Sequence, residues 1–194
     1  LPGDLKLDPS LATWVNEIQV INEAYVGLTT LNEHTVATEP GIASDWSASE
    51  DGMTYTFNLY PDVPWVRYDP DLGEVVQITD EAGNVRKVTA QDIIYGTSRT
   101  LDPATGSQYA GVLAPWIVGG QEKLAGEDVE LAMVAVDDYT LQITSPKPAG
   151  FLPMIYGLWM SRPEPQWTIE EISASLACRC RRTHIQNDSQ YHRR

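Results

Sequence analysis

Side chains capable of acid–base or nucleophilic catalysis are few in this sequence and poorly placed for it. His34 is the only histidine before residue 184, and it lies in a polar, loop-like stretch, NEHTVATEP. A Ser/His/Asp arrangement would depend on it alone, and neither Gly-x-Ser-x-Gly nor His-Glu-x-x-His occurs. Adjacent carboxylates form the pairs Glu50-Asp51, Asp80-Glu81, Asp137-Asp138 and Glu170-Glu171. Because acid–base catalysis needs two carboxyl groups in different environments facing one substrate, these pairs predict no catalytic site.

Two groups of residues have side chains that suit a metal ion. The segment 69–74, DPDLGE, offers carboxylate oxygens for Ca²⁺ but lacks the ligand number of an EF-hand. Near the end of the chain, Cys178, Cys180, His184 and His192 fit no standard zinc spacing. We therefore expect no resident metal and no cofactor.

Tryptophan and tyrosine are the more informative functional side chains. The chain has six Trp and nine Tyr against two Phe. Rings that carry a polar group suit ligand cavities and recognition surfaces, although they also fill cores. Together with the acidic loops, these rings are also consistent with a second class of protein, a secreted β-rich carbohydrate-binding or adhesion module. A hydrolase with an unrecognised site is a third possibility, disfavoured by the shortage of histidine.

Charge divides the chain into two parts. The net charge of -14 disfavours a nucleic-acid or anionic-membrane partner. Residues 178–194, in contrast, hold five arginines against one aspartate, and both cysteines of the chain. We interpret 178–194 as an aberrant basic tail, such as a frameshift product. The opening LPGDLKLDPS has no signal-peptide pattern and is typical of a mature or trimmed N-terminus.

Helix-period patterns predict the elements that would position any site. One apolar stripe joins Trp14, Ile18, Ile21, Tyr25 and Leu28, with Ser10 or Thr13 as cap and Gly27 as end. Thr89-Ala-Gln-Asp92 resembles a capping box and opens a helix to about Leu101, which Asp102-Pro103 stops. Shorter helices are expected at 108–113, 150–160 and 168–177.

Alternating patterns predict a short strand at 28–32 and three hairpins. The first runs from Pro40 to Leu59 and turns at Asp51-Gly52, after which Tyr55, Phe57 and Leu59 share one face. The second is expected at 74–88, with 74–79 paired to 85–88, and the third at 131–145. Hairpins mixed with helices indicate an α+β fold with a largely antiparallel sheet.

Several of these segments carry motifs of one protein family. Residues 40–59 match the pattern P-x-x-A-x-x-W-x-x-S-x-D-G-x-x-Y-x-F-x-L, and Leu7-Asp-Pro9 matches an L-D-P motif. Residues 88–99, with Tyr95 and Arg99, match V-T-A-x-D-V-x-Y-x-x-x-R except at the position of the second valine. In these motifs, collinear over about 7–171, the chain resembles family 5 extracellular solute-binding proteins, the oligopeptide, dipeptide and nickel receptors of ABC importers. The insertion at about 66–87 and the end after about Glu171 depart from the family.

The resemblance implies a periplasmic-binding-protein-like type II fold, of which this chain holds an incomplete N-terminal lobe. It divides the chain into the start of the lobe I core (1–27), a hairpin-rich subdomain (28–150), a return toward the core (151–177) and the tail (178–194). It implies that two lobes close over a peptide or similar small solute, outside the cytoplasm, and deliver it to an ABC permease. The ligand-binding residues it implies are Ala12, Thr13, Trp14 and Tyr109. The opposing lobe would supply the other contacts, so residues 1–194 alone should bind ligand weakly or not at all.

Overall fold

The computed structural model describes residues 5–170, which fall into two compact units. The first unit ends at Glu164 and the second begins at Pro165. In chain order the first unit contains α1 (Val15–Ala24), β1 (Thr29–Leu31), β2 (Thr38–Pro40), β3 (Ala43–Ala48), β4 (Thr54–Leu59), β5 (Val66–Asp69), β6 (Glu74–Gln77), α2 (Ala90–Leu101), α3 (Ala110–Leu113), the 3-10 helix η1 (Ala114–Trp116), α4 (Gly120–Leu124), β7 (Met133–Asp137), β8 (Thr140–Thr144), α5 (Leu152–Ile155) and the 3-10 helix η2 (Trp159–Ser161).

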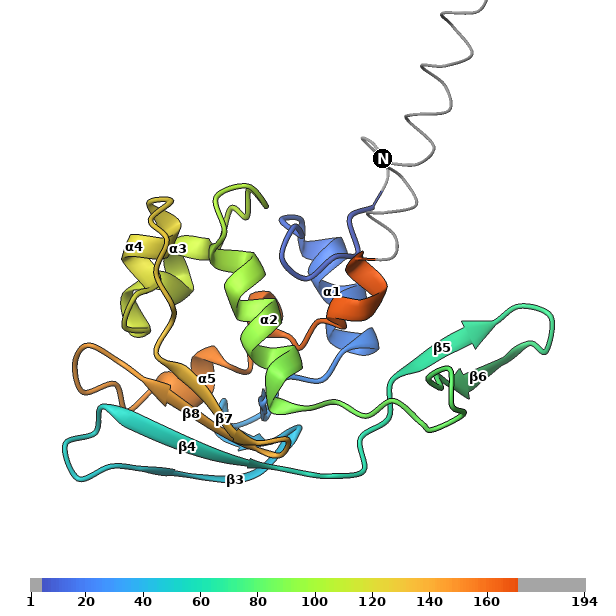
Figure 1. The fold of residues 1–194 in the computed structure, drawn as a ribbon, viewed down its shortest axis with the longest axis horizontal. Helices are drawn as coiled ribbons and strands as arrows, with labels where there is room; N and C mark the ends of the chain where they lie inside the picture. Colours follow the sequence, from blue (N-terminus) through green and yellow to red (C-terminus); the bar gives the residue numbers. More distant parts are fainter. Residues whose placement is uncertain (1–4, 171–194) are drawn as a thin grey trace, which may run out of the picture. The chain divides into compact units, whose positions relative to one another are not determined.

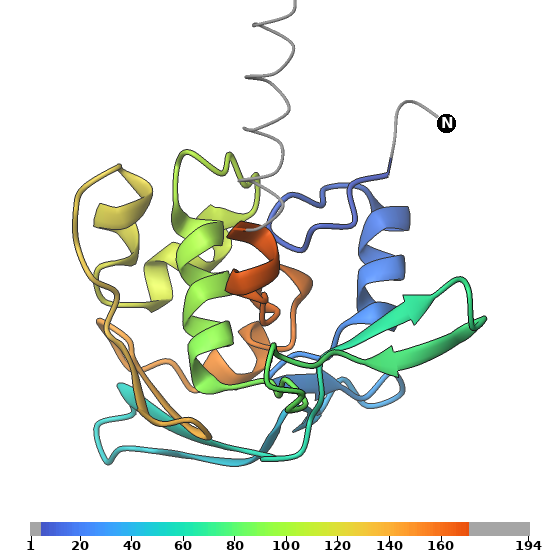
Figure 2. The same cartoon turned by 45° about the vertical axis from the view of Figure 1, so that its right-hand side comes forward.

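The main sheet is antiparallel and has the strand order β3-β4-β8-β7. The alternation predicted for residues 54–59 is confirmed, since Tyr55, Phe57 and Leu59 are buried while the residues between them are half-buried or exposed. Leu141 lies opposite Phe57 on β8 and is fully buried. The helices, with α2 foremost, lie on one side of this sheet (Figures 1 and 2). The core is therefore the layer between the sheet and α2.

The first hairpin turns where the Asp-Gly pair predicts. Gly52 has φ +68°, which glycine adopts without steric cost. Asp51 accepts hydrogen bonds from the Ser49 hydroxyl at 2.6 Å and the Met53 N–H at 3.0 Å, and these bonds lower the pKa of Asp51. The third hairpin, β7 with β8, is also confirmed.

The second hairpin is only partly where the alternation predicts it. β6 pairs with β5, which precedes it, through a tight turn that ends at Gly73. The predicted pairing of 74–79 with 85–88 is reduced to a single bridge between Thr79 and Val85. The predicted partner was wrong for residues 74–77, because Asp69 accepts the N–H groups of Asp71 and Leu72, which folds the chain back before β6.

α2 has the bounds that its sequence predicts. The Asp92 carboxylate accepts both the N–H and the hydroxyl of Thr89, at 2.8 and 3.0 Å. α1 differs, because its N-cap position is Trp14 rather than Ser10 or Thr13, and the Glu17 carboxylate satisfies the N–H groups there. Trp14, which begins the apolar stripe by spacing, has an exposed side chain.

The predicted helix at 150–160 is broken into one turn, α5, and the short η2. No clear sequence pattern predicts α4. Of the segment 168–177 only the residues to 170 are described, in a helical stretch that begins at residue 166. The proposed tail, 178–194, lies outside the described residues, and the four-part division of the chain stays a prediction. No helix in the range 5–170 is both long enough and apolar enough to cross a bilayer.

Candidate functional site

The N-terminal loop and the loop after α2 lie at the end of the first unit that is remote from the main sheet (Figures 1 and 2). These loops carry all four residues predicted to bind ligand. Ala12 is buried, Thr13 is half-buried, and Trp14 is 64 % exposed. An exposed tryptophan ring is available for contact, whereas Ala12 offers backbone groups at most.

A tryptophan that sequence reasoning missed connects two of the four. The Trp159 indole N–H donates to the Ala12 carbonyl at 3.4 Å. Its ring meets the Tyr109 ring edge-on, with centroids 4.8 Å apart and planes at 77°. We call Ala12, Tyr109 and Trp159 the aromatic bridge. It joins three segments separated by up to 147 residues in the chain, which is why no local pattern reveals it.

The backbone N–H groups of the N-terminal loop are largely occupied within the protein. Glu17 accepts the N–H of Lys6 at 2.9 Å, of Thr13 at 2.9 Å and of Trp14 at 3.0 Å. The Ala12 N–H donates to the Asp8 carbonyl at 3.0 Å. A ligand at this loop would therefore contact the Trp14 ring and the Thr13 side chain rather than these backbone N–H groups.

Glu17 ties the shape of this loop to pH. The N–H groups of Lys6, Thr13 and Trp14 favour its ionised form and hold the pKa of Glu17 below its ordinary value of 4.5. A carboxyl group whose pKa is lowered by folding stabilises the fold above its unfolded-state pKa. That contribution is lost as the pH falls through the lower folded-state value.

We accordingly predict that Glu17→Gln lowers the melting temperature at pH 7. The deficit relative to the parent chain should begin to shrink as the pH falls below about 4.5, where the unfolded chain takes up a proton at Glu17. It should vanish once the pH is below the lower folded-state pKa. Circular-dichroism melts at several pH values measure this. Glu23→Gln, an exposed change on the same helix, is the matched control. A deficit that is constant with pH would contradict the assignment.

A partly buried ionic cluster of Asp8, Arg99 and Glu164 anchors the N-terminal loop to α2. The two terminal nitrogens of Arg99 contact the two oxygens of Asp8 at 2.7 and 2.6 Å. One of them also donates to Glu164 at 2.8 Å. Two carboxylates thus share one guanidinium, and the contact with Asp8 is bidentate. Bidentate hydrogen bonds between charged groups are stronger than single bonds between neutral groups.

Two hydroxyl groups complete this cluster. Ser10 donates to Glu164 at 2.6 Å and lies 2.8 Å from the Thr100 hydroxyl. Thr100 also donates to the Met160 carbonyl at 2.9 Å. Burial raises the pKa of Glu164, against the opposing effects of Ser10 and Arg99. The cluster therefore fixes the loop that carries Ala12 and the segment that carries Trp159 on the same helix.

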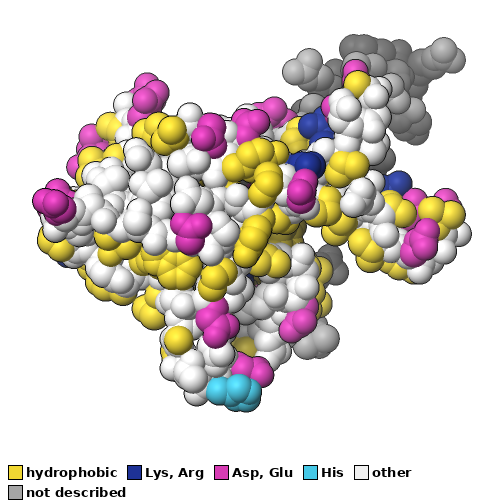
Figure 3. Space-filling view, turned by 90° about the horizontal axis from the view of Figure 1, so that it is seen from below, with side chains coloured by type: hydrophobic (Ala, Val, Ile, Leu, Met, Phe, Trp, Pro, Cys, Tyr) yellow, Lys and Arg dark blue, Asp and Glu magenta, His cyan; other side chains and the backbone are white. Residues whose placement is uncertain are grey.

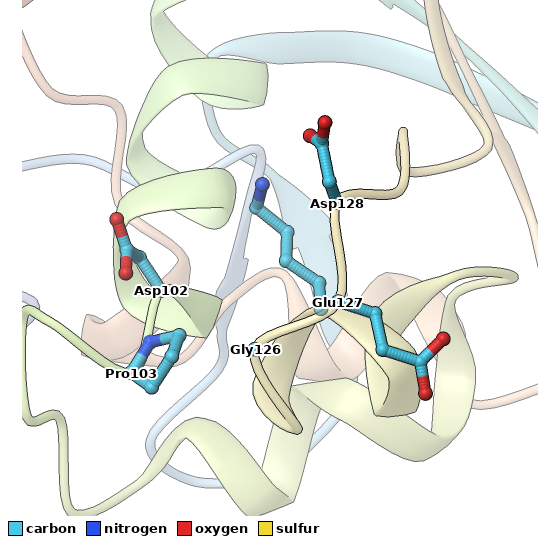
Figure 4. A pocket seen from close by; sticks show the side chains of 6 residues that line it. Asp102, Pro103, Gly126, Glu127 and Asp128 are labelled. Atoms are coloured by element: carbon cyan, nitrogen blue, oxygen red, sulfur yellow. The ribbon is translucent and has the colours of Figure 1, made fainter.

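A separate acidic hollow of about 230 Å³ lies beside the C-terminal end of α2. It is lined by Asp102, Pro103, Lys123, Gly126, Glu127 and Asp128. Figure 4 shows the Asp128 and Glu127 carboxylates pointing in different directions. Residues 5–170 contain no group of three or more acidic, His or Cys side chains placed to hold a metal ion.

Acidic side chains predominate on the surface. On the face seen in Figure 3 they are scattered around a band of hydrophobic atoms, with only a few Lys and Arg side chains among them. This distribution agrees with the net charge of -14 and disfavours nucleic acid as a partner.

Comparison with known proteins places the chain in a family. Residues 37–176 match the family described as bacterial extracellular solute-binding proteins, family 5 Middle. The chain belongs to this family. It is 31 % identical over 170 residues to the periplasmic oligopeptide-binding protein OppA of Escherichia coli K12, covering 85 % of this chain and 27 % of OppA. It is 34 % identical over 145 residues to the murein peptide-binding protein MppA of the same organism, covering 73 % of this chain and 24 % of MppA.

Solved structures agree with the sequence match. The unliganded open form of MppA superposes with a TM-score of 0.71 at 30 % identity, covering 86 % of this chain and 29 % of MppA. Haemophilus influenzae OppA in complex with the peptide RPPGFSPFR superposes at 0.70 and 26 % identity, covering 86 % of this chain and 30 % of that one. The predicted periplasmic-binding-protein type II fold, of which the chain holds a part, is confirmed.

Family membership also decides between the classes of protein left open by the sequence. Family 5 proteins bind solutes and are not enzymes, and nothing in the comparisons supports a carbohydrate-binding or adhesion module. The chain spans about 27 % of the length of the oligopeptide-binding relative. What the whole receptor binds is therefore a matter for proposal.

Proposed function

We propose that this chain supplies one wall of the ligand cleft in the substrate-binding component of an ABC importer. The receptor takes peptides or similar small solutes outside the cytoplasm and delivers them to a membrane permease. The aromatic bridge is the observation that carries the proposal. It joins Ala12 and Tyr109, which come from the two loops described above, through the Trp159 side chain.

The chemistry of this wall suits an extended peptide. Tyr109 and Trp159 are only partly buried and present ring surface with a phenol hydroxyl, and the exposed Trp14 adds a third ring nearby in sequence. Family relatives named for oligopeptides, dipeptides and murein peptides support peptides over other solutes. Their periplasmic designation supports a location outside the cytoplasm.

Residues 5–164 placed in the matching region of E. coli OppA provide the test, with peptide binding measured by calorimetry. We expect the hybrid receptor to bind short peptides and Tyr109→Ala to weaken binding about tenfold, the loss typical of an aromatic contact. Tyr60→Ala, a half-exposed tyrosine at the end of β4, is the matched control and should change nothing. A folded hybrid that binds no peptide, or one indifferent to Tyr109→Ala, overturns the proposed wall.

A further inference from the structure

Arg162 is a buried cation that residues 5–170 leave without a counter-ion. The residue directly follows η2 and is 6 % exposed. One terminal nitrogen donates to the Asn22 side-chain carbonyl at 2.9 Å. The Nε and Nη1 atoms are inaccessible to solvent and have no hydrogen-bond acceptor among the described residues.

Two glycines make room for Arg162, one beside its side chain and one beside its backbone. A Cβ on Gly27 would collide with Arg162 Nη1 and would lie 2.7 Å from the Tyr156 carbonyl oxygen. A Cβ on Gly96, in α2, would collide with the Arg162 carbonyl oxygen. The guanidinium is therefore held in a shaped recess and does not rest on the surface by chance.

The recess holds a charge at physiological pH. Burial lowers the pKa of Arg162 to about 10, so the guanidinium remains cationic at pH 7. Within the range 5–170 no carboxylate contributes to the pKa of Arg162, whereas two carboxylates raise the pKa of Arg99. Buried charges in folded proteins are normally paired, because unpaired donors lose their hydration without replacement. Two unused donors thus indicate an acceptor that these residues do not provide.

The outer face of α1 beside this recess has room for a partner. A hollow of about 370 Å³ is lined by Gln19, Val20, Asn22 and Glu23. Val20 is 42 % exposed, and Val15, four residues before Gln19 and so on the same face, is 71 % exposed. Asn22 lines the hollow and also accepts the hydrogen bond from Arg162. The Asn22 side chain therefore separates an occupant of the hollow from the guanidinium.

We infer that Arg162 is a docking point for a carboxylate side chain on a polypeptide segment that packs against the outer face of α1. That segment belongs to the part of family 5 receptors that this chain does not span. On docking, the Asn22 side chain moves aside and the carboxylate pairs with the guanidinium in its recess. Burial of Val15 and Val20 under the same segment provides the free energy for this rearrangement.

Other occupants fit less well. A free anion would bury no apolar surface and could not reach the enclosed donors unaided. The carboxylate of a bound peptide belongs elsewhere, because Asn22 lies eight residues beyond Trp14, about 12 Å along α1. The inference rests on family membership and not on the identity of the ligand, so it can fail while the proposed peptide function stands.

The first test uses the complete 194-residue chain in urea denaturation. We expect Arg162→Met to leave the midpoint unchanged or to raise it, because it removes a charge that lacks a counter-ion. Arg99→Met should lower the midpoint strongly. If Arg162→Met lowers the midpoint as far as Arg99→Met does, Arg162 already has its counter-ion and the inference is overturned.

The second test adds the separately produced remainder of E. coli OppA, the region outside the match, to the same chain. We expect capture of this region to be at least about tenfold weaker with Arg162→Met, intermediate with Arg162→Lys, and unchanged with the exposed control Arg67→Met. Absence of capture, or equal capture by the parent chain and Arg162→Met, overturns the inference. So does acetate or inorganic phosphate raising the melting temperature of the parent chain but not of Arg162→Met, which would show a small-anion site.

Discussion

Replacing Arg99 by methionine is expected to lower the free energy of unfolding by roughly 3–5 kcal/mol, the usual cost of removing one partner from a buried ion pair. The substitution leaves the Asp8 and Glu164 carboxylates close together with no cation between them. Glu164 is 2 % exposed, so its charge cannot be rehydrated without opening the structure. Urea denaturation of the 194-residue chain measures the loss.

The deficit of Arg99→Met should depend on pH in a defined direction. Burial already raises the pKa of Glu164, and loss of Arg99 removes an interaction that opposes this rise. A carboxyl group whose pKa is raised by folding leaves the fold most stable at pH values below its unfolded-state pKa. That stability is lost as the pH rises through the folded-state pKa. The variant should therefore approach the parent in stability under acidic conditions and fall furthest behind near neutrality.

Arg67→Met is the matched control for this experiment. Arg67 pairs with Asp69 at 3.0 Å, but its side chain is 58 % exposed, and exposed pairs contribute about 0–1 kcal/mol. A loss for Arg99→Met no larger than that for Arg67→Met would show that the ionic cluster does not anchor the N-terminal loop. The candidate ligand wall would then lack the support assigned to it.

Local patterns in the sequence predict the elements of this fold far better than they predict its site. The Asp51-Gly52 turn, the alternation in β4 and the Thr89–Asp92 cap are each specified by neighbours within a few residues. They are found as predicted. The pairing predicted for residues 74–77 was wrong because a turn precedes this strand as well as following it. The Asp69 side chain stabilises the earlier turn, and 74–77 pair with β5.

The site depends on contacts that no local pattern encodes. Trp159 meets Ala12 and Tyr109 across long sequence separations, and Arg99 reaches Asp8 across 91 residues. Trp14 fits the apolar stripe of its helix by spacing, yet it lies at the N-cap, outside the first turn, and its side chain is exposed. A family motif contains Arg99 and the resemblance implies Tyr109, but only the structure shows Arg99 paired with Asp8 and Tyr109 packed on Trp159.

The second large effect is expected in the core beneath that wall. Phe57 is fully buried in β4, and its ring lies 6.2 to 6.4 Å from the rings of Trp46, Tyr55 and Tyr156. Phe57→Ala removes the centre of this group and leaves a cavity between the sheet and the helices. Large-to-small changes of this kind cost about 3–5 kcal/mol.

The loss from Phe57→Ala should extend to the aromatic bridge. Tyr156 packs on Phe57 and lies three residues before Trp159, so a cavity at Phe57 loosens the segment that holds the Trp159 indole against Ala12. We expect the fluorescence of the Trp159 indole, read as the difference from a Trp159→Phe background, to shift at urea concentrations below the main transition. Thr56→Ala, a change on the other face of the same strand, is the control. It should neither lower the stability to this extent nor shift the indole fluorescence early. If Phe57→Ala lowers stability while the indole signal changes only with global unfolding, the ligand wall is held by the ionic cluster alone.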